Sequence, residues 1–355
     1  MPPVLVRQVR DGVTESAHRG DAVEVDASGR VLHAIGDPDR LVNLRSAGKP
    51  FGLVALLRAG GQAEFDLTSE ELAVMASSHS GEDLHVRTIL ALHRRAGIPQ
   101  AALACGVDGP MDALTAARLA RDGERPGPLR QMCSGQHSAF LLLARMGGWE
   151  LETYWQEDHP AHLAYAEVVA TAFGVVPGDL VSSIDSCGIA TYAFPLREIA
   201  RAFAVLADPA AIGDPDPRAT VARHLVTVRD AMLDHPELVA GTRGRLDTAL
   251  MKAVPRGLVA KGGAEALSCV GLLPGTRAPG SAASGLALKI EDGGGYERAS
   301  HAATVEALAQ LGALPDPALR MLARYHRPPS LDPHGRVAGE AIASFELAPL
   351  GELTG

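Results

Sequence analysis

Short strand-like runs occupy both ends of this chain and enclose a long helical middle. Turn signals such as Asp11-Gly12 and Ser28-Gly29 separate the first runs, which indicates an opening antiparallel meander. The strand-like runs are residues 3–8, 23–25, 31–35, 257–260, 267–270, 286–290 and 341–348. Because strands and helices do not alternate regularly, we expect an α+β fold whose antiparallel sheet takes strands from both chain ends.

Apolar residues in the middle of the chain recur about every 3.6 positions, which is the period of a helix with one buried face. Thr68-Ser69-Glu70-Glu71 is a capping box and predicts a helix before Leu72. Helical patterns cover residues 51–57, 72–75, 82–97, 138–146, 161–173, 199–206, 302–311 and 316–324. We expect residues 1–355 to form a single unit with two lobes, an α/β lobe from both termini and a helical lobe from the middle.

The chain carries a formal net charge of -9 at pH 7, and no cluster of Lys or Arg stands against that background. This balance argues against a nucleic-acid or anionic-membrane partner and favours a small-molecule substrate. The N-terminal residues lack the apolar stretch of a signal peptide, and no apolar run approaches the roughly 20 residues that a membrane helix requires. We therefore expect a cytosolic protein whose cysteines stay reduced.

Lysine is scarce among the 33 basic side chains and occurs only at Lys49, Lys252, Lys261 and Lys289. Only lysine can lose its proton at accessible pH, so its remaining positions are candidates for chemistry, although a coding bias would have the same effect. If a helix begins near Ser46, the amine of Lys49 can reach back to the hydroxyl, unless Pro50 interrupts the helix. Such a pair supplies a nucleophile and its base when burial or a second cation lowers the pKa of the lysine.

Three further polar segments combine hydroxyl, thiol, imidazole or carboxylate groups. They are Ser77-Ser78-His79-Ser80-Gly81-Glu82, Cys133-Ser134-Gly135-Gln136-His137-Ser138 and Ser182-Ser183-Ile184-Asp185-Ser186-Cys187-Gly188. Each has a structural explanation as well, because serines are favoured helix caps and isolated cysteines are usually small buried thiols. A Cys–His nucleophile or a Zn²⁺ site needs more ligands than these local spacings supply. No glycine-rich fingerprint for a nucleotide cofactor occurs.

Five motifs in a fixed order give the chain a resemblance to a known family. They are Arg45-Ser46-Ala47-Gly48-Lys49-Pro50-Phe51, Ala76-Ser77-Ser78-His79-Ser80-Gly81-Glu82, Cys133-Ser134-Gly135-Gln136-His137-Ser138, Asp185-Ser186-Cys187-Gly188 and Ala260-Lys261-Gly262-Gly263-Ala264-Glu265. Through these motifs the chain resembles the asparaginase II family, and in particular its rhizobial-type (class 3) L-asparaginases, over residues 4–345.

The resemblance implies hydrolysis of L-asparagine to L-aspartate and ammonia, with no required cofactor, by a homodimer. It also implies a fold similar to serine β-lactamases and penicillin-binding proteins, and two Ser–Lys pairs, Ser46 with Lys49 and Ser78 with Lys261. We expect Ser46 to attack the amide carbon while Lys49 takes its proton. Ser78 and Lys261 would then carry protons to the departing ammonia. The sequence does not decide which serine forms the β-aspartyl ester.

The expected contacts with substrate rest on charge complementarity with L-asparagine. Gly262 and Gly263 would offer main-chain N–H groups to the oxyanion that forms during attack. Arg45 would hold the α-carboxylate, and Asp185 would receive the α-ammonium group or orient His137.

Zinc binding is a conditional expectation. Relatives that resemble the rhizobial enzyme bind zinc through two cysteines and a lysine, and the matching residues here are Cys133, Cys187 and Gln136. Because a neutral amide is a poor ligand beside two thiolates, we expect zinc to bind weakly, to recruit water or His137, or to be absent. In the family the metal lies beside the reacting groups and is not the hydrolytic Lewis acid.

Two alternatives remain open from the sequence. The first is another serine acyl-transfer enzyme on the same scaffold, such as a glutaminase, a β-lactamase or a peptidase, although the Lys-Thr-Gly triplet of β-lactamases is absent. The second, from a different class, is a non-catalytic metal- or thiol-binding protein that uses Cys133 and Cys187.

Overall fold

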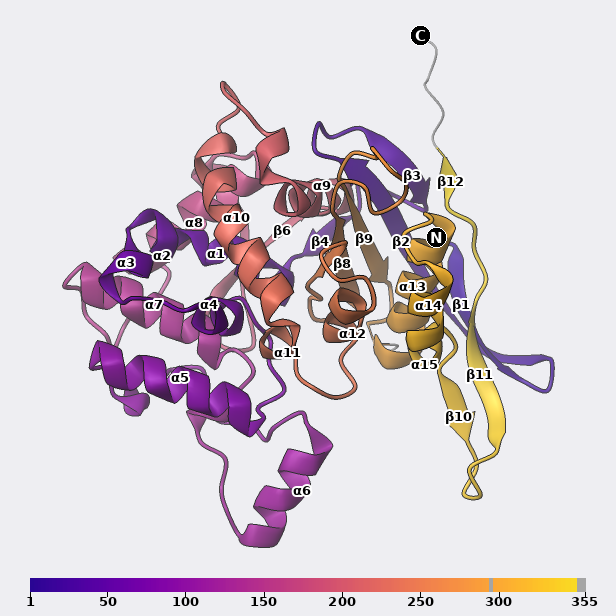
Figure 1. Ribbon diagram of the computed structural model, residues 1–355, viewed down its shortest axis with the longest axis horizontal. Helices are drawn as coiled ribbons and strands as arrows, with labels where there is room; N and C mark the ends of the chain where they lie inside the picture. Colours follow the sequence, from indigo (N-terminus) through magenta and orange to yellow (C-terminus); the bar gives the residue numbers. More distant parts are fainter. Residues whose placement is uncertain (294–295, 350–355) are drawn as a thin grey trace. The chain divides into compact units, whose positions relative to one another are not determined.

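The computed structural model describes residues 1–293 and 296–349, and the chain divides into two compact units. Unit 1 consists of Met1–Ala47, Ala193–Ala211 and Ala249–Gly355, whereas unit 2 consists of Gly48–Tyr192 and Ile212–Thr248. Figure 1 traces both units along the chain. None of the helices in the described part of the chain has the length and apolar character needed to cross a membrane.

Unit 1 is built on an antiparallel sheet with strand order β10-β11-β1-β2-β9-β8-β7, in which β3 also pairs with β2, and β12 with β3. The strands are β1 (Val4–Arg10), β2 (Val13–Asp26), β3 (Val31–Ile35), β7 (Leu258–Ala260), β8 (Leu267–Leu272), β9 (Ser284–Ile290), β10 (Pro329–Leu331), β11 (Val337–Ala343) and β12 (Ala348–Pro349). Strand β1 pairs with β11, so that Val6 lies opposite Ala343. The expectation of a mixed fold with one antiparallel sheet from both chain ends is therefore confirmed.

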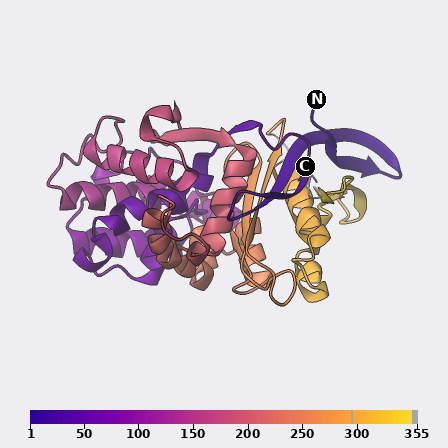
Figure 2. The same ribbon diagram turned by 90° about the horizontal axis from the view of Figure 1, so that it is seen from above.

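Helices cover both faces of this sheet, which explains why all six residues of β8 are buried. Figure 2 shows α9 (Leu196–Ala207) on one side of β8 and β9, and α13 (His301–Gln310), α14 (Asp316–Met321) and α15 (Ala323–His326) on the other. Helix α9 lies unusually close to β9, because a Cβ atom at Gly285 would overlap the carbonyl oxygen of Ala200. Strand β4 (Leu41–Asn43) pairs with the last three residues of β6 (Ala190–Pro195).

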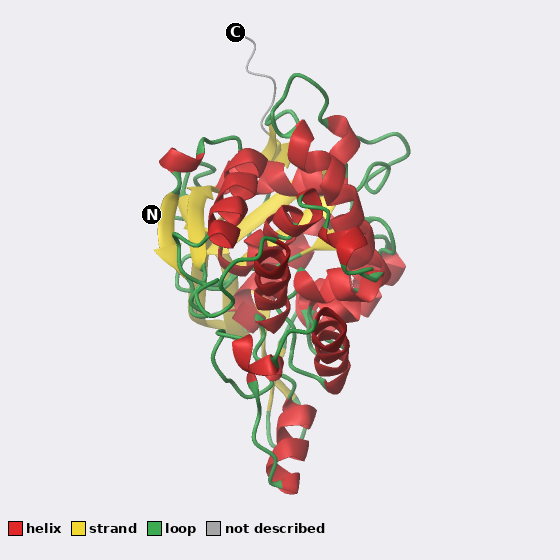
Figure 3. Ribbon diagram, turned by 90° about the vertical axis from the view of Figure 1, so that its left-hand side faces the viewer, coloured by secondary structure: helices red, strands yellow, loops and turns green. Residues whose placement is uncertain are grey.

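Unit 2 is mainly helical and carries the short strand β5 (Val181–Ile184). Its helices are α1 (Lys49–Gly52), α2 (Val54–Arg58), α3 (Gly61–Glu64), α4 (Ser69–Met75), α5 (Asp83–Ala96), α6 (Ala113–Asp122), α7 (Ser134–Met146), α8 (Pro160–Phe173), α10 (Ala219–Asp234) and α11 (Pro236–Val239), while α12 (Leu246–Ala253) crosses the boundary at Thr248. Helix α6 projects from the remainder of this unit (Figure 3).

Helix α7 is the central element of unit 2, because every residue from Ser134 to Ala144 is buried. It packs on α2, α4, α5 and α8. A Cβ atom at Gly135 would overlap the carbonyl oxygen of Val74 in α4, so glycine allows the two helices to approach closely at that point. The N-terminal turn of α7 therefore places polar side chains, Gln136 and His137 among them, inside the unit.

Several expected elements differ from the structure. Helix α7 begins at Ser134 and not at residue 138, because its first turn is polar yet buried and so lacks the amphipathic pattern. The last long strand is Val337–Ala343 and not 341–348. The helix expected at 316–324 is two short helices, and α6, α10 and α12 have no counterpart among the expected elements.

Candidate active site

Lys49 is the first residue of α1, which follows a 3₁₀ turn at Arg45–Gly48. Pro50 lies in the first turn of this helix, where main-chain N–H groups make no hydrogen bond within the helix. The absence of an N–H group in proline therefore does not interrupt the helix. The Lys49 side chain is 2% exposed, which is unusual for a lysine and requires polar partners inside the unit. The start of α1 thus directs a buried amine into unit 2.

The buried amine of Lys49 has two polar partners in unit 2. Its Nζ atom donates to Ser78 Oγ at 3.0 Å and to Cys133 Sγ at 3.1 Å. Ser78 lies in the loop after α4, and Cys133 immediately precedes the first residue of α7. Three segments that are distant in the sequence therefore meet at one amine.

Cys133 is hydrogen-bonded to the thiol of Cys187, and both side chains are buried. The pKa of Cys133 is lowered, because the Cys187 thiol donates a hydrogen bond to it and Lys49 lies nearby, and these effects outweigh burial. The same contact raises the pKa of Cys187. Cys133 is therefore the more acidic of the two thiols, and the Lys49 amine lies beside it.

A buried imidazole connects the Ser78 loop to the N-terminus of α7. His79 accepts a hydrogen bond from the Gly81 N–H group at Nδ1, so its Nε2–H donates to Ser134 Oγ at 2.9 Å. The Ser134 hydroxyl donates in turn to the carbonyl oxygen of Leu129. Burial holds the pKa of His79 well below its usual range, so the ring stays neutral.

His137 is fully buried, and its Nδ1 atom lies 2.5 Å from the hydroxyl of Tyr154. Its Nε2 atom has no hydrogen-bond partner within the part of the chain that the structure describes. Burial lowers the pKa of His137 to about 3. Asp185, the other expected contact, follows β5 and accepts a hydrogen bond from the Ser186 N–H group at Oδ1. The partner at His137 Nδ1 is thus Tyr154.

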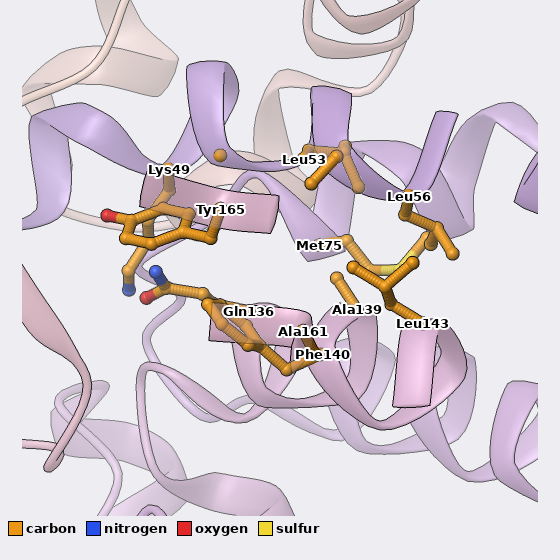
Figure 4. Close-up of a pocket in the computed structure, with 12 residues that line it drawn as sticks. Lys49, Leu53, Leu56, Met75, Gln136, Ala139, Phe140, Leu143, Ala161 and Tyr165 are labelled. Atoms are coloured by element: carbon orange, nitrogen blue, oxygen red, sulfur yellow. The ribbon is translucent and has the colours of Figure 1, made fainter. Parts of the chain in front are cut away.

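A small cavity lies behind Lys49 in unit 2. Figure 4 shows the Lys49 amine, the Gln136 amide and the Tyr165 hydroxyl at one end of it, with apolar side chains from α2, α7 and α8 along the rest. Its volume of about 10 Å³ leaves room for about one water molecule. L-Asparagine does not fit there, so the cavity is not a substrate pocket.

The remaining site residues expected from the sequence lie in unit 1. Ser46 is partly buried in the 3₁₀ turn, and Arg45 before it has a φ of 47°, which is an uncommon backbone conformation for arginine. Lys261 follows β7, is 1% exposed, and donates from Nζ to the carbonyl oxygen of Gly262 at 2.7 Å. The Gly263 N–H group donates to the carbonyl oxygen of Leu267 at 2.9 Å. Both expected catalytic lysines are thus buried.

The thiols do not form a complete zinc site. Within residues 1–293 and 296–349, no three His, Cys, Asp or Glu side chains converge in a way that could hold a metal ion. The Lys49 amine instead donates a hydrogen bond to Cys133 Sγ. An amide at Gln136 is a poor third ligand for Zn²⁺, so the residues present do not fit a tetrahedral centre.

Sequence reasoning missed two parts of this site. It did not anticipate the contact between Lys49 and Cys133, because these residues are far apart in the chain. It also missed Arg245, whose Nη2 atom donates to the Ser78 carbonyl oxygen at 3.0 Å. No local pattern distinguishes Arg245 from the other arginines near it.

Comparisons with known proteins place the chain in a family. The family model described as L-asparaginase II matches residues 6–343. No curated protein matches the chain. The solved structure "Crystal Structure Analysis of Mglu in its glutamate form" is 16% identical with a TM-score of 0.34, covering 83% of this chain and 61% of that one. The structure of "Mglu in its tris and glutamate form" is 18% identical with a TM-score of 0.36, covering 88% and 64%.

The chain thus spans less than two thirds of the length of these two structures. The family model, in contrast, matches nearly the whole chain, and the motifs around Lys49, Ser78, Cys133 and Lys261 all lie inside the matched residues. The chain belongs to the L-asparaginase II family.

Proposed function

We propose that this protein is an amidohydrolase that converts L-asparagine to L-aspartate and ammonia through a serine ester. The observation that carries the proposal is the buried Lys49 amine 3.0 Å from the Ser78 hydroxyl in a member of this family. A serine hydroxyl becomes a useful nucleophile only when a neighbouring base removes its proton. A buried amine in hydrogen-bond contact with a hydroxyl supplies that base.

The contact between Lys49 and Ser78 supports a proton relay. Ser46 attacks the side-chain amide carbon, and its proton passes to Lys49. A hydroxyl can accept one proton and donate another, so Ser78 can pass a proton from Lys49 toward the leaving nitrogen. The C–N bond breaks as that nitrogen leaves as ammonia, which forms a β-aspartyl ester. Water then cleaves the ester and restores the serine.

The roles of the other residues come from the family resemblance and from charge. Lys261 takes part in the second proton transfer, and the main-chain N–H groups at Gly262 and Gly263 stabilise the oxyanion. Arg45 and Asp185 are candidates for the α-carboxylate and the α-ammonium group of the substrate. His137 is a candidate for a substrate contact as well. The burial of His137 and its hydrogen bond to Tyr154 favour a role behind the residues that contact the substrate.

Ammonia release from L-asparagine, L-glutamine and a chromogenic β-lactam tests this function. We expect L-asparagine to be the preferred substrate, and a preference for either other compound would contradict the proposal. Ser46→Ala and Ser78→Ala should each lower turnover by at least about 10²–10⁴-fold, which is the usual contribution of a positioned proton-transfer group. Ser77→Ala is the matched control, because this neighbouring serine is also buried.

Mass spectrometry of rapidly quenched enzyme identifies the acylated serine. We expect the added mass of a β-aspartyl group on Ser46. An adduct on Ser78 would exchange the roles of the two serines. If no adduct forms while turnover proceeds, the covalent mechanism is wrong.

Three further properties are proposed from the family alone. They are a fold similar to serine β-lactamases and penicillin-binding proteins, a homodimeric assembly, and a cytosolic location. Sedimentation velocity of the purified protein tests the second, because a monomer at working concentration would contradict it.

A further inference from the structure

The last residue of α11 and the loop before α12 hold both main-chain groups of Ser78. The Ser78 N–H group donates to the carbonyl oxygen of Val239 at 3.0 Å, and Arg245 donates from Nη2 to the Ser78 carbonyl oxygen at 3.0 Å. Residues 239–245 therefore fix the backbone of a proposed catalytic residue. The same contacts place a guanidinium group next to Ser78.

Arg245 is half-buried and forms no ion pair with an acidic side chain among the residues that the structure describes. Its second contact, from Nη1 to the sulfur of Met111, is with a weak acceptor. A guanidinium group has five N–H donors and suits planar anions. A partly buried arginine without a carboxylate partner is therefore a candidate for binding an anionic ligand.

The acidic side chains near Arg245 are already occupied by other groups. Glu82 accepts from the N–H group of Thr242 at 2.7 Å and from its hydroxyl at 2.5 Å. Asp112 makes a two-pronged contact with Arg243 at 2.8 and 2.7 Å. Arg243 thus has its own anionic partner, whereas Arg245 has none in the described chain.

We propose that Arg245 receives the α-carboxylate of the substrate and thereby selects amides that carry a carboxylate. This inference rests on the proposed asparaginase activity and names a specificity-determining residue for it. Arg245, which lies in unit 2, thus takes the contact with the α-carboxylate that charge complementarity alone suggested for Arg45.

The size of the substrate agrees with this arrangement. In L-asparagine, three single bonds of about 1.5 Å join the amide carbon to the carboxylate carbon, so these atoms lie within roughly 4 Å of each other. The reacting amide has to lie beside Lys49, whose Nζ is 3.0 Å from Ser78 Oγ. Arg245 holds the carbonyl oxygen of the same serine, so both ends of the substrate can be reached from one residue.

The local electrostatics support an anion at this place. Burial lowers the pKa of both His79 and His85, and the charge of Arg245 acts in the same direction on each. Each of the stacked imidazoles accepts a main-chain N–H group at Nδ1, which suits the neutral ring, so neither competes for the carboxylate. Arg245 remains as the cationic group at the Ser78 main chain, and a carboxylate would balance its charge.

The test compares two substrates with Arg245→Gln, Arg245→Lys and Arg45→Gln. One substrate is L-asparagine, and the other is its α-N-methylamide, in which a neutral group replaces the carboxylate and ammonia can come only from the side chain. We expect Arg245→Gln to lower kcat/KM for L-asparagine by about 10- to 100-fold, the range of a lost charge-assisted contact, and to change the value for the methylamide by less than about threefold. Arg245→Lys should lose part of the preference.

Equal losses on both substrates would mean that Arg245 only positions Ser78, and this result would overturn the inference. If Arg245→Gln lowers kcat/KM for neither substrate, the inference is wrong. It is wrong as well if only Arg45→Gln abolishes the preference for L-asparagine over the methylamide. Arg243→Gln is the matched control, because this arginine already has Asp112 as its partner and should leave the ratio of the two substrates unchanged.

Failure of the proposed function is recognised separately. If the wild-type protein releases no ammonia from L-asparagine, calorimetry with L-aspartate replaces the kinetic assay. Binding to the wild-type protein that weakens by about 10-fold or more in Arg245→Gln would keep the carboxylate site while the hydrolytic proposal fails. If L-aspartate does not bind, or binds both proteins equally, the carboxylate site is wrong.

Discussion

Replacing Lys49 by methionine tests the proposed chemistry most directly, because the change removes the amine and keeps an unbranched side chain of similar length. The variant loses the donor to Ser78 at 3.0 Å and the donor to Cys133 at 3.1 Å. With the base gone, we expect turnover of L-asparagine to fall by about 10²–10⁴-fold.

The effect of Lys49→Met on folding should be small by comparison. Two buried hydrogen bonds donated by the amine are lost, each contributing about 0.5–1.5 kcal/mol. The cost of burying the polar amine, roughly 1–3 kcal/mol, disappears at the same time. These opposing terms leave a change of about 2 kcal/mol or less in the free energy of unfolding, so the variant should fold.

Two measurements check this prediction together. Initial rates of ammonia release give the loss of activity, and urea unfolding gives the change in stability. Lys252→Met is the control, because that lysine is exposed and should retain wild-type rates. If Lys49→Met stays within about threefold of the wild-type rate, Lys49 is not the base and the relay is wrong.

Three further predictions concern helix α7 and the histidine that contacts its Ser138. Gly135→Ala should lower the free energy of unfolding by about 1–3 kcal/mol in urea titrations, since its Cβ atom would overlap the Val74 carbonyl oxygen, and unchanged stability would refute the close packing. Burial lowers the pKa of His93 from 6.5 to about 4, so the unfolded chain binds more protons than the folded chain between these pH values. The free energy of unfolding should therefore fall as the pH drops from 6.5 to 4, and this slope should be shallower in His93→Asn. Elemental analysis of the wild-type protein should find less than one zinc per chain, and Gln136→Lys, which places an amine in the same turn as Cys133, should hold more zinc. One tightly held zinc per wild-type chain would contradict the conclusion that these residues do not fit a tetrahedral zinc centre.

Local sequence patterns predicted the elements whose burial follows a regular period. The capping box at Thr68 and Glu71 forms as expected, with both reciprocal hydrogen bonds. Helix α5 ends at Ala96, and Gly97 after it adopts the left-handed conformation typical of a glycine at the end of a helix. These features depend on residues three or four positions apart, so the sequence alone contains the information.

The candidate site depends on contacts over much longer separations. Lys49 Nζ reaches Ser78 across 29 residues and Cys133 across 84. No periodic pattern encodes such contacts, and the N-terminal turn of α7 contradicts the usual rule because its polar residues are buried. Family motifs identified Ser78 and Cys133 as site residues, but the single amine that joins them is visible only in the structure.

The neutral state of His79 explains how these distant groups are kept together. Its Nδ1 atom has to accept from the Gly81 N–H group, and its Nε2–H has to donate to Ser134. Protonation would turn Nδ1 into a second donor facing the Gly81 donor, so only the neutral ring suits both contacts. Through them one imidazole ties the loop of Ser78 to the residue that follows Cys133. The spacing between Ser78 and Cys133, the two partners of Lys49, therefore depends on an uncharged His79 ring. Burial lowers the pKa of His79 and so keeps the ring uncharged.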